Sequence, residues 1–193
     1  MSALIDAALS NARLRSHIDR GRIAAAGFSA GGYDALLLAG ATPDFKLLRT
    51  YCRTNPDDRE FCSGWHVEIT RPDLHVAADL RIKAVLALAP LGIYFDRRGL
   101  AGVRVPVDIW AAGADRVLPV KWNAARIRAL LRRTPEYSIV PNAGHLVFLS
   151  PCTPAFKGKA PALCSDPPGV DRKAVHSRIV ADATQFFSRV FDG

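Results

Sequence analysis

Apolar and polar positions follow two different patterns along this chain, and each pattern predicts its own kind of element. Short runs that are apolar on both faces are typical of strands inside a parallel sheet, and they cover residues 22–26, 81–90, 105–112 and 137–140. Apolar positions at helical spacing occupy stretches between and beyond these runs, at 3–14, 32–39, 121–133 and 171–191. Strands that alternate with helices predict an α/β fold, in which helices cover both faces of one parallel sheet.

Residues 41–80 interrupt this alternation with a long excursion that has no clear period. Segments of this length inside a compact domain are uncommon unless they have a function. We therefore expect residues 1–193 to form a single domain, in which 41–80 is a lid or the wall of a pocket.

The junction between the first strand and the helix that follows it reads Gly27-Phe28-Ser29-Ala30-Gly31. A Gly-x-Ser-x-Gly turn between a strand and a helix predicts a nucleophile elbow, in which a strained turn lifts the serine hydroxyl out of the sheet. Such a turn needs neighbours nearly without side chains, and we expect Gly27 and Gly31 to meet that need. The alternative is a plain turn in which Ser29 only caps the helix.

Two further polar residues follow later strands of the predicted sheet. Asp115 comes after the strand at 105–112, and His145 comes after the strand at 137–140. Because functional residues gather at the carboxyl ends of parallel strands, we expect Ser29, Asp115 and His145 to meet there. A serine hydroxyl is a poor nucleophile without a base, so His145 is predicted to take its proton and Asp115 to hold the imidazole tautomer.

The remaining parts of the site are predicted from their positions beside these residues. The Ala30 N–H follows the nucleophile directly and is the expected oxyanion donor. Gly144 is expected to permit a close backbone approach at the turn that carries the histidine. Phe28, Trp65 and Tyr94 are the candidates for substrate binding.

Other acidic and histidine side chains are weaker candidates for the reaction. Asp96 is the second choice of acid, because an insertion separates it from the end of its strand. Asp108 is expected to make a buried hydrogen bond inside a strand. Surface or local structural roles are expected for His17, His66, His75 and His176, although His66 is also a candidate for the pocket wall beside Trp65.

The 193 residues carry a formal net charge of +8, but the basic side chains are scattered along the chain. Nucleic-acid binding requires a concentrated basic patch, so we expect no nucleic-acid partner, only a mild attraction to anionic lipid or acidic substrates. No run approaches the roughly 18 consecutive apolar residues of a membrane span. Asp6 interrupts the first apolar stretch, which therefore differs from a signal peptide.

Four cysteines form two local pairs, Cys52 with Cys62 and Cys152 with Cys164, each inside a polar loop. Two loop disulfides would each add roughly 3 kcal/mol of stability, and they persist only in an oxidising compartment. A zinc site is the competing interpretation, although the spacing lacks a Cys-x-x-Cys pair.

The sequence resembles the α/β-hydrolases, and among them the predicted dienelactone hydrolases related to plasma-type platelet-activating-factor acetylhydrolases. The matching motifs are RIAAAGFSAGGY, RIKAVLALAP, VPVDIWAAGADRVLP and VPNAGHLVFL. The resemblance implies a triad of Ser29, Asp115 and His145 that hydrolyses an ester or short acyl group, without a metal or cofactor. Dienelactone hydrolases use a cysteine nucleophile, so Ser29 favours the esterase side of the group.

The chain differs from this family at its N-terminus, where only about 21 residues precede the first strand. The resemblance implies several further strands there and the loop that carries the second oxyanion donor, so the fold is expected to be N-terminally truncated. The first strand is then expected at an open sheet edge, where it could pair with a second copy of the chain.

Three functional hypotheses follow: an esterase, a catalytically impaired fragment that acts through assembly, and a peptidase or acyltransferase with the same triad. The predicted disulfides favour a periplasmic or secreted protein with an upstream signal, and the chain as written favours the cytoplasm.

Overall fold

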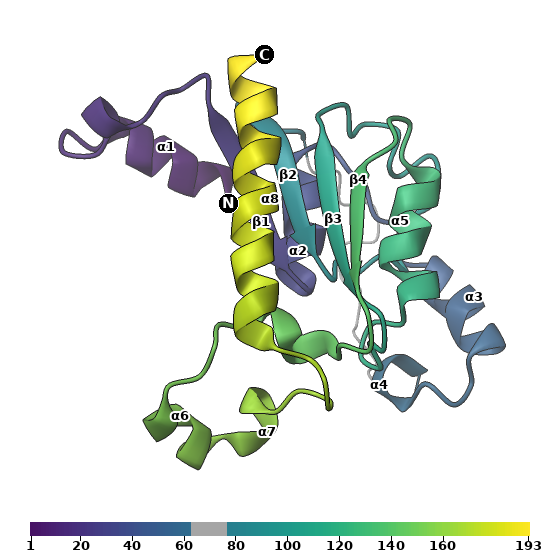
Figure 1. Ribbon diagram of the computed structural model, residues 1–193. Helices are drawn as coiled ribbons and strands as arrows, with labels where there is room; N and C mark the ends of the chain where they lie inside the picture. The colour runs from purple at the N-terminus through teal and green to yellow at the C-terminus, as the bar shows by residue number, and fades with distance from the viewer. Residues whose placement is uncertain (63–76) are drawn as a thin grey trace.

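A computed structural model of the protein describes residues 1–62 and 77–193 (Figure 1). Its centre is a four-stranded sheet in the order β1-β2-β3-β4, and all three neighbouring pairs are parallel. The strands are β1 (Ile23–Phe28), β2 (Ile82–Leu88), β3 (Val107–Ala112) and β4 (Glu136–Val140). Each predicted apolar run therefore contains or overlaps a strand, and the sheet is parallel as predicted.

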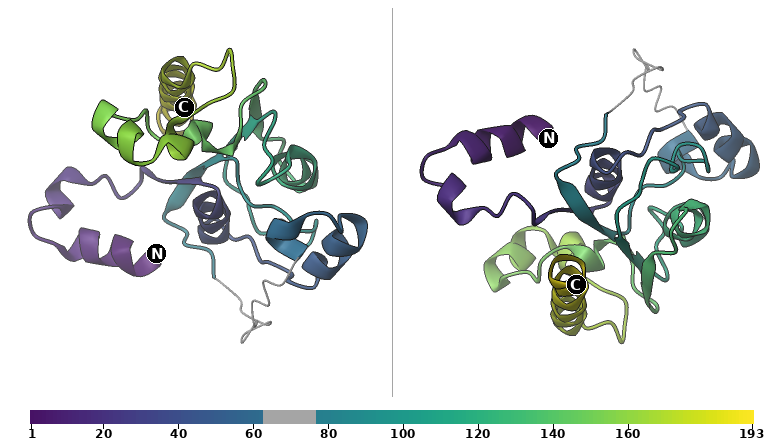
Figure 2. Two further views of the ribbon diagram at one scale, coloured as in Figure 1. Left: turned by 90° about the horizontal axis from the view of Figure 1, so that it is seen from below. Right: turned by 90° about the horizontal axis from the view of Figure 1, so that it is seen from above.

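Helices cover both faces of the sheet, which confirms the predicted fold class (Figure 2). The helices α2 (Ala30–Leu38) and α5 (Ala124–Leu130) pack on one face, over a core that includes Leu36, Ile109 and Ile127. On the other face, α8 (Arg172–Asp192) packs over Trp110 and the short 3-10 helix η3 (His145–Phe148). The carboxyl ends of all four strands consequently lie at one edge of a three-layered unit.

The other helices are short and lie outside this unit. They are α1 (Ser2–Ser10), η1 (Arg15–His17), α3 (Leu47–Thr54), α4 (Arg59–Cys62), η2 (Val120–Trp122), α6 (Pro154–Lys159) and α7 (Pro161–Cys164). Disulfides join Cys52 to Cys62 and Cys152 to Cys164, so both predicted pairings are confirmed.

Two helical stretches differ from the sequence-based expectation. Two helices, α3 and α4, form in the stretch expected to lack a period, because Tyr51 packs edge-on against Trp122 and the Cys52–Cys62 disulfide joins the two helices. The helix predicted at 121–133 is shorter, since Asn123 has non-helical φ and ψ angles of −120° and −97°, and its buried side chain accepts a hydrogen bond from Gly92 N–H. Trp122 therefore faces α3 and not the core of the sheet.

β1 forms one edge of the sheet in the described part of the chain and pairs there only with β2. The nearby helix α1 has no buried residue, and an Arg81–Asp6 ion pair at 2.5 Å attaches it. The exposed edge that the sequence predicts is thus present, and its pairing with a second copy stays a prediction.

Asp108 lies inside β3 beneath α8, with 3% of its surface exposed, and accepts a hydrogen bond from Trp110 Nε1 at 3.2 Å. The predicted buried hydrogen bond is therefore present. Burial raises the pKa of Asp108 from 3.8 to about 6; Glu136 and Asp182 also raise it, whereas the Trp110 bond and Arg189 lower it.

This raised pKa predicts a specific pH dependence of stability. Between pH 3.8 and about 6 the unfolded chain loses the Asp108 proton and the folded chain keeps it, so the free energy of unfolding falls as pH rises. Urea denaturation of Asp108→Asn across this window should show a weaker decline and a more stable protein at neutral pH. The exposed Asp57→Asn control should keep the decline, and equal slopes for both variants would contradict the prediction.

Candidate active site

Ser29 lies at the point where β1 ends and α2 begins, and its backbone conformation is one that residues other than glycine rarely adopt. Its φ and ψ are 58° and −119°, and its N–H donates to Leu88 O at 2.9 Å. Its carbonyl accepts from Gly32 and Tyr33 of α2, and from Leu91 after β2. The strained turn that the elbow pattern predicts is therefore present, and bonds to both neighbouring elements hold it in place. The Ser29 side chain makes no capping hydrogen bond to α2. The alternative interpretation, in which Ser29 only caps the helix, is therefore not supported.

The glycines around Ser29 have unequal roles. A Cβ at Gly27 would lie 2.0 Å from Gly31 O, which leaves no space for any side chain. A Cβ at Gly32 would lie 3.0 Å from the Pro90 side chain, whereas one at Gly31 would meet nothing within 4 Å. The expectation that Gly31 must lack a side chain is wrong, because its own backbone, and not its Cβ position, makes the close contact with Gly27.

Three polar side chains from different loops form a continuous hydrogen-bonded chain. His145 Nε2 lies 2.9 Å from Ser29 Oγ, and His145 Nδ1 lies 2.7 Å from Asp115 Oδ2. The Asp115 and His145 residues are each only 7% exposed. The structure thus brings together the three residues that the sequence singled out, at distances suited to proton transfer.

The hydrogen bonds of Asp115 determine which nitrogen of His145 carries a proton. Asp115 Oδ1 accepts from the N–H groups of Val117 and Leu118, at 2.9 and 2.7 Å, which leaves Oδ2 for the imidazole. A carboxylate only accepts, so Nδ1 must donate and Nε2 is left with its lone pair directed at Ser29. In this tautomer the imidazole can accept the hydroxyl proton of Ser29.

Backbone bonds tie the turn of Asp115 to the turn of His145. Gly113 N–H donates to Val140 O at 2.8 Å, and Ala114 N–H donates to Ala143 O at 2.9 Å. The turn of His145 bends at Asn142, whose φ is 58°. Gly144 has an ordinary φ of −86° and an added Cβ there would meet nothing within 4 Å, so the role expected for Gly144 is wrong. Proline followed by asparagine suits the two central positions of a turn whose second position needs a positive φ, and this signal could have identified Asn142.

The predicted substrate-binding residues occupy different places. The Phe28 ring lies 4.7 Å from the imidazole of His145 and 6.0 Å from the Phe148 ring, so Phe28 supports the imidazole from one side. The Tyr94 ring lies 5.1 Å from Phe45 and 6.2 Å from Tyr33, in an aromatic cluster beside α2. Trp65 lies outside the described residues.

Aromatic hydroxyls in this cluster are poor bases for the reaction. Burial raises the pKa of Tyr33 to about 12, and burial also raises the pKa of Tyr94. Both phenols therefore stay neutral at physiological pH, whereas the imidazole of His145 lies within hydrogen-bond distance of the Ser29 hydroxyl.

The weaker candidates of the sequence lie away from Ser29 or serve local structure. Asp96 Oδ1 accepts from Gly99 N–H at 2.6 Å in a turn, and His176 Nε2 lies 3.0 Å from Val147 O. His17 is exposed in η1. His66 and His75 lie outside the described residues.

The start of α2 leaves a donor next to the nucleophile. The Ala30 N–H donates to no backbone carbonyl in the described ranges, so it is available to a developing oxyanion. No group of three or more His, Cys, Asp or Glu side chains within residues 1–62 and 77–193 is placed to hold a metal ion. None of the helices in these ranges combines the length and apolarity that crossing a membrane requires.

Comparisons with known proteins give only distant structural similarities. No family model and no curated protein matches the sequence. Solved structures with a similar fold include a predicted CIB-like hydrolase from Thermoplasma acidophilum (13% identity, TM-score 0.43), covering 83% of this chain and 55% of that one. The carboxylesterase Cest-2923 from Lactobacillus plantarum shares 17% identity at a TM-score of 0.47, over 78% of this chain and 55% of its own.

A third similar structure is Thermogutta terrifontis esterase 2 phosphorylated by paraoxon, with 14% identity and a TM-score of 0.45, over 86% of this chain and 52% of that one. The chain thus spans about half the length of these three structures. Because one fold can host many activities, the function has to be argued from the site itself.

Proposed function

We propose that this chain is a serine hydrolase of the α/β-hydrolase type that cleaves carboxylic esters through an acyl-enzyme on Ser29. The observation that carries the proposal is the hydrogen-bonded chain from Ser29 through His145 to Asp115, with distances of 2.9 and 2.7 Å. The strained φ of Ser29 and the free N–H of Ala30 support it. The proposed substrates are short acyl esters, lactones or phospholipid-like acetyl esters, following the family that the sequence resembles.

The reaction follows from the positions of these groups. Ser29 Oγ attacks the ester carbonyl carbon while His145 Nε2 takes the hydroxyl proton, and the Ala30 N–H stabilises the resulting oxyanion. The C–O bond to the alcohol then breaks, and the imidazolium returns its proton to the leaving oxygen. Water attacks the acyl-enzyme by the same route and releases the carboxylic acid, while Asp115 holds the imidazole throughout.

The number of oxyanion donors affects how the proposal should be tested. The Ala30 N–H is the donor that the described residues place directly after Ser29, and loss of one donor costs about 10²–10³-fold in rate where it has been measured in other enzymes. Covalent labelling needs only one attack by the serine, so it remains sensitive when turnover is slow. We therefore choose labelling over steady-state hydrolysis.

A fluorophosphonate probe should label the folded chain at Ser29, and intact-mass and peptide spectra should place the adduct on that residue. The Ser29→Ala variant should not be labelled. Ser10, an exposed serine in α1 that lies outside the site, provides the matched control, and Ser10→Ala should be labelled like the native chain. Absence of labelling on folded native protein would refute the hydrolase and favour a fragment that acts through assembly.

Parallel assays with short esters, peptides and alcohol acceptors distinguish esterase from peptidase or acyltransferase action. We propose in addition that residues 41–80 form a lid or a wall of the substrate site; residues 63–76 of this segment lie outside the described residues. The two disulfides support a periplasmic or secreted location, because such bonds persist in oxidising compartments.

A further inference from the structure

Asn123 occupies the N-cap position of α5 and is buried, with 1% of its surface exposed. An asparagine at this position usually accepts a hydrogen bond from one of the first N–H groups of its helix. The side chain of Asn123 makes no capping hydrogen bond to α5. Its amide bonds instead to two loops outside the helix, so helix capping does not account for it.

The oxygen of this amide holds the loop that follows β2. Asn123 Oδ1 accepts from Gly92 N–H at 2.8 Å, and the N–H of the preceding Leu91 donates to Ser29 O at 3.2 Å. The two backbones are also in contact, because a Cβ added at Gly92 would lie 2.7 Å from Asn123 O. Asn123 is therefore linked to the carbonyl of the proposed nucleophile through two adjacent residues.

The loop after β2 is strained and is bonded at both of its ends. Its first residue, Ala89, has a φ of 40°, and Ser29 beside it has a φ of 58°. Such conformations persist only where the surrounding structure determines them. Ala89 N–H donates to Trp110 O at 2.7 Å at one end, and Gly92 N–H donates to Asn123 at the other. Loss of the Asn123 side chain would release one end of the segment that holds Ser29.

The nitrogen of the same amide holds the turn that carries Asp115. Asn123 Nδ2 donates to Pro119 O at 3.1 Å, beside the bond of 3.0 Å from Trp122 N–H. Leu118, one residue before this proline, donates its N–H to Asp115 Oδ1 at 2.7 Å. One amide thus connects the turn of the acid with the loop that supports the nucleophile, and both bonds require a side chain that accepts and donates.

We infer that Asn123 is a positioning residue for the reaction of Ser29. Its amide fixes the loops after β2 and β3 relative to each other, and with them the placement of Ser29 against His145 and Asp115. It acts through the backbone of these loops and takes no part in the proton transfers. This role rests on the proposed hydrolase activity. A displacement of about 1 Å in a catalytic site can cost about 100-fold in rate, which sets the size of the expected effect.

Fluorophosphonate inactivation of the full chain, followed over a range of probe concentrations, tests this role. Asn123→Ala should lower the inactivation rate constant at saturating probe by about 100-fold. The probe concentration that gives half of this rate should stay the same, because the reacting groups are displaced while the surface that binds the probe is kept. Asn123→Leu keeps the branching and the number of side-chain heavy atoms but has no polar group. It should lose as much, whereas a role in packing alone would be restored by leucine.

The imidazole of His145 provides a second readout that needs no reaction. Its Nδ1 lies 2.7 Å from Asp115 Oδ2, and the proton in this charge-assisted hydrogen bond should give a far-downfield resonance in proton NMR spectra. The resonance should shift or disappear in both Asn123 variants. If the probe does not label the native chain, the proposed hydrolase activity fails, and the resonance by itself decides the role of Asn123.

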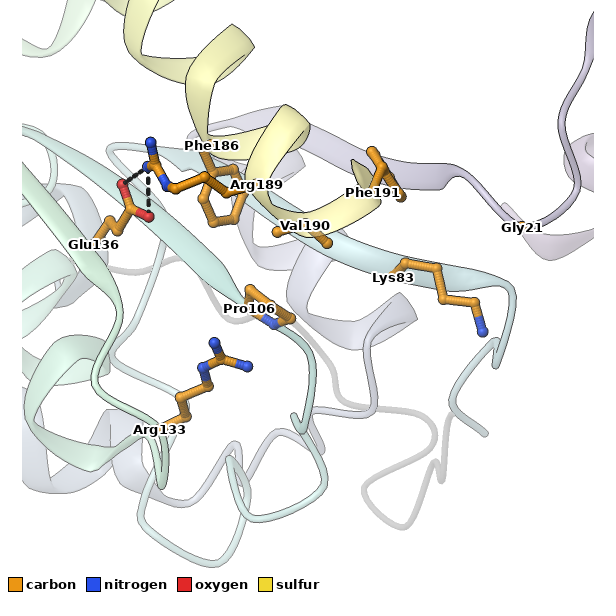
Figure 3. A pocket seen from close by; sticks show the side chains of 9 residues that line it. All are labelled: Gly21, Lys83, Pro106, Arg133, Glu136, Phe186, Arg189, Val190 and Phe191. Carbon is orange, nitrogen blue, oxygen red and sulfur yellow. Dashed lines mark hydrogen bonds and ion pairs between the residues drawn. The ribbon is translucent and has the colours of Figure 1, made fainter. Parts of the chain in front are cut away.

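Phe186→Leu is the matched control, because it weakens the core away from the site. Phe186 is 2% exposed, and with Pro106 it lines a hollow at the amino ends of the strands, the opposite edge of the sheet from Ser29 (Figure 3). This variant should lose stability in urea and keep the native inactivation rate and resonance. The inference is overturned if a folded Asn123 variant keeps the native rate and resonance, if Phe186→Leu loses them alike, or if neither Asn123 variant folds.

Discussion

Replacement of Asp115 by Asn is expected to slow the attack of Ser29 by about 10⁴-fold, the loss that the equivalent change produces in a serine protease. The reason lies in how Asp115 divides its two oxygens. Oδ1 accepts from the N–H groups of Val117 and Leu118, and Asn keeps this role through its own carbonyl oxygen. The amide nitrogen then faces His145 Nδ1, which must accept instead of donate.

This exchange of donor and acceptor moves the imidazole proton to Nε2, so the histidine can no longer take the proton of Ser29. The inactivation rate by the fluorophosphonate measures the effect without requiring turnover. The control is Asp96→Asn: among the described residues the Asp96 carboxyl accepts a hydrogen bond from Gly99 N–H in a turn, and an amide oxygen can accept the same bond. A loss below about tenfold for Asp115→Asn, or equal losses for both variants, would contradict this assignment.

Gly27→Ala is the second change with a large expected effect, this time on folding. The new methyl group would lie 2.0 Å from Gly31 O and 2.2 Å from Gly31 C, and neither atom can move without displacing the start of α2. Overpacked core sites lose about 1–3 kcal/mol, and a clash with backbone should reach or exceed the upper end. We expect a loss of about 3 kcal/mol or more in free energy of unfolding, measured in urea.

Gly31→Ala is the matched control, because it adds the same methyl group to the same turn. An added Cβ at Gly31 meets nothing within 4 Å, and alanine favours a helix over glycine by about 1 kcal/mol. The control should therefore fold with equal or slightly higher stability. If both variants lose stability alike, the asymmetry between the two glycines is refuted.

Much of the fold could be predicted because its elements are locally encoded. The run from Ala84 to Leu88 is apolar on both faces, and such a run is stable only inside a covered parallel sheet. The long last helix was also predictable, since Asp171 caps it through Lys173 N and Ala174 N. The helix around Trp122 was predicted too long because Asn123 bonds to Gly92, a residue 31 positions away. The sequence pattern around Asn123 contains no information about a hydrogen bond to Gly92.

The same distinction applies to the candidate site. Local sequence pattern was enough to place a serine in a strand–turn–helix junction and to place Asp115 and His145 after later strands, because these are properties of neighbouring residues. The distance of 2.9 Å between Ser29 Oγ and His145 Nε2, which are 116 positions apart, follows from the folded arrangement of the strands and their loops. The folded arrangement also determines that Gly27 and not Gly31 must lack a side chain, and that Asn142 and not Gly144 bends the histidine turn. These outcomes depend on which atoms of distant segments come within contact distance, and packing in three dimensions sets those distances.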